Sequence, residues 1–477
     1  MKPYASLMAG SALVLLSACA AGPDYVPPAP PASTHYDAAA ESRPGIAFGE
    51  KPAGDWWRVF RSDKLDGVMR QAIAGNLDLA AADATIAQAA EAVASARGGL
   101  YPQVDYGSGL GRQRLASPPQ AGASNFYAIG AQVSFDPDVF GGTHRVIEQR
   151  EAFAEFQRRR FDAARLTLTG DVATQAILLA SARAQIEAVQ ALLADDRKTL
   201  DLVRIAHQTG SLTQVDLVLA ESQIAQDETL LPPLAQQRDA ARHALSILAG
   251  AGPADWVAPD FDLADFSLPA KLPVSLPAEL AHDRPDILQA EAELHAASAA
   301  VGIATANLYP RLTLSASFTQ AASDPGALFE PGGVFWGIAA GLTGPIFHGG
   351  ALQADRRGAE DAYTASLARY RQTVIRSFGQ VADVLQAIDH HAEERAAQER
   401  ALASADISLH LSRDGYRGGE AGILRVLDAQ RAYERALLGQ IKVRTAQYLD
   451  TTQLLVALGG NSAGAAQLTA STGDQSE

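Results

Sequence analysis

The hydrophobic pattern of the chain is helical over two very long stretches. Apolar residues recur every three or four positions between Gly142 and Gly210, and again between Ala351 and Asp414, and neither stretch contains a proline. A period near 3.6 predicts amphipathic helix, and helices of this length favour coiled-coil-like packing. A continuous helix over the first stretch would be about 95 Å long, because each residue adds about 1.5 Å. A simple antiparallel bundle would show the same pattern.

Four shorter runs alternate between apolar residues and polar or small residues. The first run of each pair begins after Tyr101-Pro102 or Tyr309-Pro310, and the second follows a loop rich in glycine and proline. Period two over about ten residues is typical of a membrane β-barrel strand, whose apolar side chains face lipid. An ordinary half-buried sheet alternates in the same way. We expect strands near residues 102–113, 125–136, 310–320 and 334–344, with loops 114–124 and 320–333 facing outside.

The whole pattern occurs twice. Tyr101 and Tyr309 lie 208 residues apart, and other matching pairs lie 209 and 210 residues apart. The strand phases match at an offset of 207, which also aligns Val139-Phe140 with Ile346-Phe347. An offset that drifts so little indicates one structural unit built twice, and a repeat this long is a duplicated half-domain. Each copy is expected to run helix, hairpin, long helix, helix.

Four strands are too few for a closed barrel. An open sheet edge is not tolerated in lipid, so the missing strands must come from other chains. Three protomers would supply twelve strands in all, about the number needed for an even-numbered barrel with a lumen. The predicted fold class is therefore a transmembrane β-barrel shared by a trimer and continued by an α-helical barrel.

The N-terminus reads as a secretory signal peptide. Lys2 precedes an apolar run from Leu7 to Leu16, and Leu16-Ser17-Ala18-Cys19 closes the segment. These last four residues resemble a bacterial lipobox, which predicts that Cys19 carries lipid (palmitate among its acyl chains); an ordinary signal with a chance cysteine is the alternative. Cys19 is the only cysteine, so no disulfide is expected. The following Ala20-Ala21 includes no acidic inner-membrane retention residue, which favours the outer membrane.

Beyond the signal peptide the chain divides into four expected regions. Proline-rich residues near the start of 22–52 predict an extended tether. No stretch of 18 apolar residues remains after cleavage, so no transmembrane helix is expected. The expected organisation is a signal peptide over 1–18, a lipid-anchored tether over 19–60, the two copies over 61–265 and 277–460, and a disordered tail over 461–477.

Charge and motifs exclude several function classes. A net charge of −15 and the lack of a basic stripe argue against a nucleic-acid partner. His390-His391 with Glu393 and Glu394 makes no recognised metal motif and is better explained as a solvated helix face. The glycine-rich residues 107–111 lie inside a strand and precede no helix, so they do not form a phosphate loop. We therefore expect no enzyme activity, no cofactor and no metal.

An ordered set of motifs resembles a known family. The chain resembles the TolC-like outer-membrane factors, in the NodT- or OprM-like lipoprotein branch. The resemblance covers nearly all of the mature chain. Its carriers are Cys19 with Gly22-Pro23-Asp24-Tyr25, Arg284-Pro285-Asp286-Ile287, the two Leu-Tyr-Pro strand entries, the run from Gly344 to Gly350, and Leu427-Asp428-Ala429-Gln430.

The resemblance implies a passive exit duct in the outer membrane. It implies a homotrimer that docks a periplasmic membrane-fusion adaptor and an inner-membrane pump, commonly of the RND type, to expel small molecules. A duct for type I secretion of polypeptides is an alternative within the same architecture. A lipid-anchored periplasmic coiled-coil scaffold is an alternative of a different class, but it leaves the alternating strands unexplained.

The resemblance also places a gate at the helix turns of residues 208–216 and 416–428. It implies that Asp216 and Tyr416 tie inner to outer coils and that Asp428 occupies an acidic position of the constriction. Arg425 stands where the family has a second acid. Arg425 and Asp428 lie one turn apart, so intersubunit pairs between them would hold the gate shut; a solvated pair on the coil surface is the alternative. Pro232-Pro233 is expected to kink or interrupt its helix.

Overall fold

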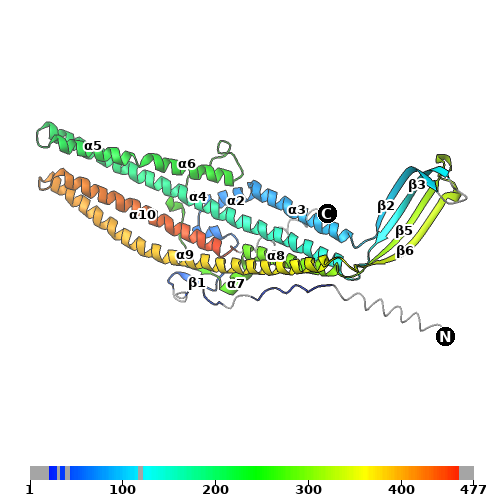
Figure 1. The fold of residues 1–477 in the computed structure, drawn as a ribbon. Helices are drawn as coiled ribbons and strands as arrows, with labels where there is room; N and C mark the ends of the chain where they lie inside the picture. Colours follow the sequence, from blue (N-terminus) through cyan, green and yellow to red (C-terminus); the bar gives the residue numbers. More distant parts are fainter. Residues whose placement is uncertain (1–20, 30–32, 38–42, 116–121, 461–477) are drawn as a thin grey trace. The chain divides into compact units, whose positions relative to one another are not determined.

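The computed structural model describes residues 21–29, 33–37, 43–115 and 122–460 (Figure 1). Cys19, the expected signal peptide, the expected tail over 461–477 and the centre of the first outer loop lie outside the described residues. The chain forms two compact units. The first contains Met1–Ala29, Asp83–Arg159 and Gln289–Gln372, and the second contains Pro30–Ala82, Arg160–Leu288 and Thr373–Glu477.

Two helices dominate the chain. Helix α4 (Gly142–Gln208) and helix α9 (Ala351–Arg417) each contain 67 residues, and Figure 1 shows both as unbroken ribbons. The two long helices predicted from the proline-free stretches are thus confirmed. Gly141 and Gly350 precede them with φ of 71° and 85°, a left-handed conformation that glycine adopts without steric cost.

One long helix is apolar enough to resemble a membrane span. Within the described residues, α4 is the one helix long and apolar enough to cross a membrane, and half of its most apolar section is buried inside the chain. The sequence predicted no such stretch, because that section is not continuously apolar. Its half-buried state is what a core helix shows, and the strands remain the membrane element.

The first unit contains a four-stranded antiparallel sheet. Its order is β2-β3-β5-β6, so the hairpins of the two copies join through β3 and β5. The four predicted strands are confirmed to within a few residues. Their bounds are β2 Gln103–Leu115, β3 Gly122–Phe135, β5 Arg311–Ala322 and β6 Val334–Thr343, with short 3-10 turns η4 (Pro325–Ala327) and η5 (Pro331–Gly333) before β6.

Helices precede each hairpin and follow each long helix. The pair before the first hairpin is α2 and α3, and the pair before the second is α7 and α8. Copy one ends in α5 and α6, whereas copy two ends in the single helix α10. The bounds are α2 Asp63–Gly75, α3 Leu77–Gly98, α5 Gln214–Glu228, α6 Leu231–Leu248, α7 Pro277–Asp283, α8 Pro285–Ala306 and α10 Ile423–Ala457.

Pro232 and Pro233 interrupt the last helix of copy one, as expected. Helix α5 ends at Glu228 and α6 begins at Leu231, so the prolines occupy the first turn of the new helix. Proline is tolerated there because first-turn backbone N–H groups have no partner within the helix. The corresponding α10 has no proline and runs for 35 residues without a break.

The main core lies in the second unit and includes residues that were expected to belong to the tether. Strand β1 (Ile46–Phe48) pairs in parallel with β4 (Leu272–Val274), and the 3-10 helix η2 (Trp56–Phe60) is buried. Trp56 and Phe60 are almost inaccessible, and Trp56 Nε1 donates to Thr169 Oγ1 at 3.3 Å. Burying side chains of this size stabilises the fold by about 2 to 3 kcal/mol each.

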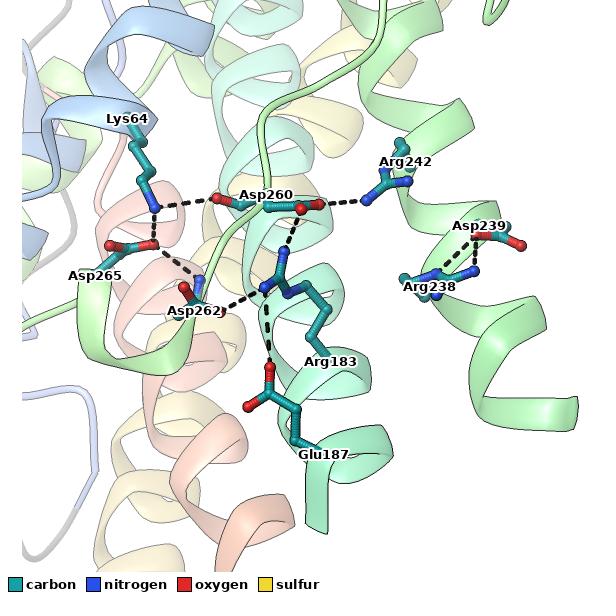
Figure 2. A network of polar contacts seen from close by, with 9 residues as sticks. All are labelled: Lys64, Arg183, Glu187, Arg238, Asp239, Arg242, Asp260, Asp262 and Asp265. Carbon is teal, nitrogen blue, oxygen red and sulfur yellow. Dashed lines mark hydrogen bonds and ion pairs between the residues drawn. The ribbon is translucent and has the colours of Figure 1, made fainter. Parts of the chain in front are cut away.

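A network of ion pairs holds the loop after α6 against α4 (Figure 2). The largely buried Arg183 guanidinium binds the carboxylates of Asp260, at 2.5 Å, and Asp262, at 3.2 Å. Arg242 of α6 also binds Asp260, and Lys64 of α2 binds Asp265 of η3 (Leu263–Asp265) at 2.8 Å. The hydrogen bond from Arg183 keeps the pKa of Asp260 below its usual range. One loop is thereby tied to three helices.

Candidate functional site

The strand register gathers the apolar side chains on one face of the sheet. Directly opposed residues share a face in an antiparallel pair. Tyr106 lies opposite Ala131, which lies opposite Phe318, which in turn lies opposite Trp336. A second row joins Val104, Val133, Ala316 and Ile338, and a row on the other face joins Asp105, Gln132, Ser317 and Gly337.

This apolar face is open in the single chain. Tyr106, Trp336, Ile338 and Leu342 are all largely exposed. A contiguous patch of large apolar side chains on a sheet marks a membrane or protein contact. Strands β2 and β6 also have no partner on their outer sides among the described residues. The sheet is therefore part of a larger barrel with lipid outside and mainly polar or small residues inside.

Residues just after Cys19 are held by a buried arginine. Arg145 of α4 donates from Nε to the Ala21 carbonyl oxygen at 3.1 Å and binds Asp24 at 2.8 Å. Its third nitrogen pairs with Glu148 at 2.7 Å. Glu148 in turn bonds His295 of α8 at 3.0 Å. The Gly22 carbonyl oxygen also accepts from Arg145, at 3.3 Å, so four partners around one cation fix residues 21–24 against α4.

Close backbone approach explains the glycine of the Gly22-Pro23-Asp24-Tyr25 motif. Gly22 has φ of 88°, and a Cβ there would lie 2.6 Å from the Cα of Gly302. The ring of Tyr25 stacks on His295 with centroids 4.2 Å apart. The motif therefore has a packing role in this chain, which its exposed, proline-rich sequence did not indicate.

The two helical hairpins turn through glycines in the left-handed region. Gly210 follows α4 with φ of 78°, and Gly419 follows α9 with φ of 77°. The next residues return to the helices, since Ser211 N donates to Ala206 O at 2.8 Å and Glu420 N donates to Gly415 O at 2.8 Å. These bonds satisfy helix-end carbonyls in the manner of a Schellman cap. Both copies thus end their long helix with a left-handed glycine and the same type of helix cap.

Asp216 lies at the N-terminus of α5 and caps it. Its carboxylate accepts from Thr213 N at 2.9 Å and from Thr213 Oγ1 at 2.7 Å, and the reciprocal bond from Asp216 N completes a capping box. These hydrogen bonds lower the pKa of Asp216. Tyr416 packs on the apolar cluster of the tip, which contains Leu200, Val203, Ala220, Ile423, Val426 and Leu427. Burial, with the Asp216 charge nearby, raises the pKa of Tyr416.

Asp428 and Arg425 both lie exposed near the start of α10. Inside the single chain, Asp428 pairs with Arg431 at 3.6 Å. No ion pair joins Arg425 to Asp428 within the part of the chain that the structure describes. The intersubunit pair remains a prediction, because it requires the neighbouring protomers.

A buried group of carboxyls was missed by the sequence reasoning. Asp196 of α4 and Glu434 of α10 both lie within hydrogen-bonding reach of Asp227 of α5. Gln430 donates to Asp196 at 2.6 Å, and Gln223 donates to both oxygens of Asp227 at 2.8 and 2.9 Å. Burial and then the neighbouring Asp227 raise the pKa of Glu434 to about 7, and they raise that of Asp196 as well. We call Asp196, Asp227 and Glu434 the carboxyl triad.

Asp195-Asp196 inside a long apolar-periodic helix was the only signal of this triad in the sequence. Of the two histidines weighed as metal ligands, His391 bonds the buried Asp450 at 2.6 Å, whereas His390 lies exposed on α9. No group of three acidic, histidine or cysteine side chains suited to a metal is found among the described residues.

The chain also matches known proteins over most of its length. The family model of the outer membrane efflux protein covers residues 68–251 and 276–460. The chain belongs to the outer membrane efflux protein family. It is an outer-membrane efflux channel, and the predicted TolC-like fold, with a β-barrel and an α-helical barrel, is confirmed.

Individual relatives of this efflux channel include transporters of different cargo. It is 30% identical over 458 residues to the pyoverdine export outer membrane protein OpmQ of Pseudomonas putida, covering 94% of this chain and 95% of OpmQ. It is 28% identical to the cation efflux system protein CusC of Escherichia coli K12, covering 93% and 97%. The solved outer-membrane channel OprN matches its fold with a TM-score of 0.87 at 23% identity, covering 93% of this chain and 100% of that one.

Proposed function

We propose that three copies of the chain form a passive exit duct for small molecules. An inner-membrane pump delivers the cargo through a periplasmic adaptor, and the duct performs no catalysis of its own. The observation that carries this proposal is the four-stranded sheet with one exposed apolar face and two unpaired edges. In lipid each edge must find another strand, and three sheets of four strands close an even-numbered barrel.

The cargo is chosen by the pump and not by the duct. The relatives are named for pyoverdine export and cation efflux, although they share one architecture with this chain. A wide lumen lined by small and polar side chains such as Ser317 and Gly337 has few groups with which to select a ligand. We assign the pump to the RND class by family likeness, and small molecules in preference to polypeptides on the same ground.

Cys19 attaches lipid and anchors the mature N-terminus in the outer membrane. Support comes from the lipobox-like Leu16-Ser17-Ala18-Cys19 and from Arg145, which holds Ala21 and Asp24, just after Cys19, against α4. We likewise propose that the two repeats occupy residues 61–265 and 277–460, after the anchored N-terminal segment. Mass spectrometry of the N-terminal peptide tests the anchor. Acylation should raise the mass of this peptide by that of the fatty-acid chains, and Cys19→Ser should prevent the increase.

Imaging tests the assembly. The protein is extracted from outer membranes in mild detergent and examined by negative-stain electron microscopy. Threefold particles with a helical section about 100 Å long are expected, since each long helix has 67 residues. Compact monomeric particles would contradict the shared barrel and would favour the periplasmic scaffold.

At the helix tips, Arg425 and Asp428 of adjacent protomers pair and hold the duct closed. The two side chains lie exposed on one face of α10, three residues apart. In planar bilayers, Arg425→Ala with Asp428→Ala should raise single-channel conductance. Arg417→Ala is the control, because Arg417 is an exposed cation of the same tip whose partner is Asp414 of its own helix. Unchanged conductance in the double variant would end the gate hypothesis.

A further inference from the structure

An aromatic pair marks the joint between the two copies within one chain. Phe140, in the segment that leads from β3 into α4, stacks on Tyr309 at the entry to β5. Their ring centroids lie 4.9 Å apart and their planes differ by 12°. The joint lies beside the place where β3 pairs with β5. An aromatic contact at the base of the strands therefore joins copy one to copy two within the chain.

Among the described residues of the single chain, the residues equivalent to this pair make no such contact. Phe347 matches Phe140 at the 207-residue offset, and Tyr101 matches Tyr309 at the 208-residue offset. Phe347 is 86% exposed, its neighbour Ile346 is fully exposed at 100%, and Tyr101 is 68% exposed. Three large apolar side chains at one end of the sheet are thus uncovered in the single chain.

Strand direction places these residues together across a subunit boundary. Neighbouring strands are antiparallel throughout the sheet, so β2 and β6 run in opposite directions. The end of β6 and the start of β2 therefore lie at the same level of the barrel. When β6 of one protomer pairs with β2 of the next protomer, Phe347 and Tyr101 meet as Phe140 and Tyr309 do within the chain.

We infer that Phe347, with Ile346 beside it, packs onto Tyr101 of the next protomer and forms the subunit joint at the base of the barrel. The occupant of this exposed apolar patch is a second copy of the chain and not lipid. The inference rests on the trimeric duct proposed above and specifies how its sheets are joined.

The subunit joint depends on this contact more than the internal joint does. Within the chain, an ion pair between Arg311 and Asp136 reinforces the aromatic contact. The counterpart of Arg311 at the 208-residue offset is Gln103, which is uncharged. A stacked aromatic pair contributes about 0.5 to 1.5 kcal/mol beyond its buried area. The subunit joint therefore relies on apolar packing by Ile346 and Phe347 without the charge pair of the internal joint.

Photocrosslinking tests the contact directly. Phe347→p-benzoylphenylalanine retains an aromatic side chain and captures neighbours on irradiation of the detergent-extracted protein. Dimer and trimer bands are expected on denaturing gels, with the crosslink mapped by mass spectrometry to peptides around Tyr101. The same probe at Phe140 should crosslink only within its own chain. Phe329, which is 77% exposed in the outer loop 320–333, is the matched control and should give no intersubunit band.

Two outcomes separate this inference from the proposed function. Threefold particles in which the probe at residue 347 captures only lipid, or nothing, would overturn the joint and leave the duct intact. Monomeric particles would contradict the duct itself. Phe347→Ala and Tyr101→Ala provide a second measurement. Each should lower the temperature at which the trimer band dissociates, and the double variant should add little to either.

Discussion

At the residue scale, the carboxyl triad gives the helical section a dependence on pH. Arg413 lowers the pKa of Asp196, and Arg431 and Arg435 lower that of Glu434, but burial and the neighbouring carboxyls outweigh them. The folded chain therefore keeps protons that the unfolded chain releases. Since unfolded carboxyls ionise near about pH 4, the triad's contribution to stability is fully present below that pH and is lost as the pH rises through about 7.

The first prediction follows from that sign. Wild-type protein should melt at a higher temperature at about pH 5 than at about pH 7.5. Glu434→Gln removes one titrating carboxyl and should reduce this difference, which thermal unfolding by circular dichroism measures. Glu393→Gln alters an exposed carboxyl of α9 and should keep the wild-type slope. An equal slope in the Glu434 variant would show that the triad does not titrate in this range.

A second residue-scale prediction concerns the ion pairs of Figure 2. Arg183→Ala leaves Asp260 and Asp262 without their shared partner. It should reduce stability by about 1 kcal/mol, because it removes a largely buried guanidinium whose hydrogen bonds to these half-exposed carboxylates are charge-assisted. Arg238→Ala is the control, since the one ion pair of Arg238 among the described residues is with its exposed neighbour Asp239. The loss of stability in each variant is measured as the fall in its melting temperature relative to wild type. Similar falls in both variants would refute a special role for Arg183.

At the scale of elements, the turns of the hairpins decide how firmly the tips are built. The Thr213–Asp216 capping box begins α5, whereas Gly422 begins α10 without a side-chain cap. The cap of α5 depends on an ionised Asp216. Hydrogen bonds from Thr213 lower the pKa of Asp216, so the cap is complete at neutral pH and is lost as the pH falls below about 4.

The element-scale prediction uses this asymmetry. Thr213→Ala should fray the first turn of α5, cost about 1 kcal/mol and raise the open probability of the channel in planar bilayers. Thr213→Ser keeps the hydroxyl and should behave like wild type. If the alanine and serine variants show the same open probability, the cap has no part in closing the tip.

At the scale of the whole molecule, adjacent strand residues should differ sharply in their tolerance of charge. Ile338 lies on the exposed apolar face, and Ala339 lies on the opposite face, where it pairs with Ser315. Ile338→Arg would place a cation in lipid at a cost of about 2 to 4 kcal/mol. Its amount in the outer membrane should fall, as measured by membrane fractionation. Ala339→Arg should assemble, and equal loss of both would contradict the assigned faces.

Much of this architecture was readable from the chain. Proline-free periodicity predicted α4 and α9, and strict alternation predicted all four strands to within a few residues. Such patterns depend on local geometry and on which face is apolar, so sequence carries them directly. The gate residues Arg425 and Asp428 were found only through family resemblance, and their pairing depends on other protomers.

Other features depend on contacts between distant segments. Trp56 reaches Thr169, Arg145 binds Ala21 and Asp24, and Asp196 meets Asp227 and Glu434. No residue spacing along the chain predicts these contacts, because they form only when separate segments pack together. The cost of burying a charge is likewise set by the surrounding helices and not by neighbours in sequence.

The sequence by itself determined the repeat, the element types and the need for partner chains, because periodicity and an incomplete barrel are properties of one chain. Tertiary structure decided how the copies combine. Each repeat is continuous in sequence, yet each compact unit takes segments from both copies, because β3 of one copy pairs with β5 of the other. Phe140 therefore has its partner inside the chain, and Phe347 must find one outside it.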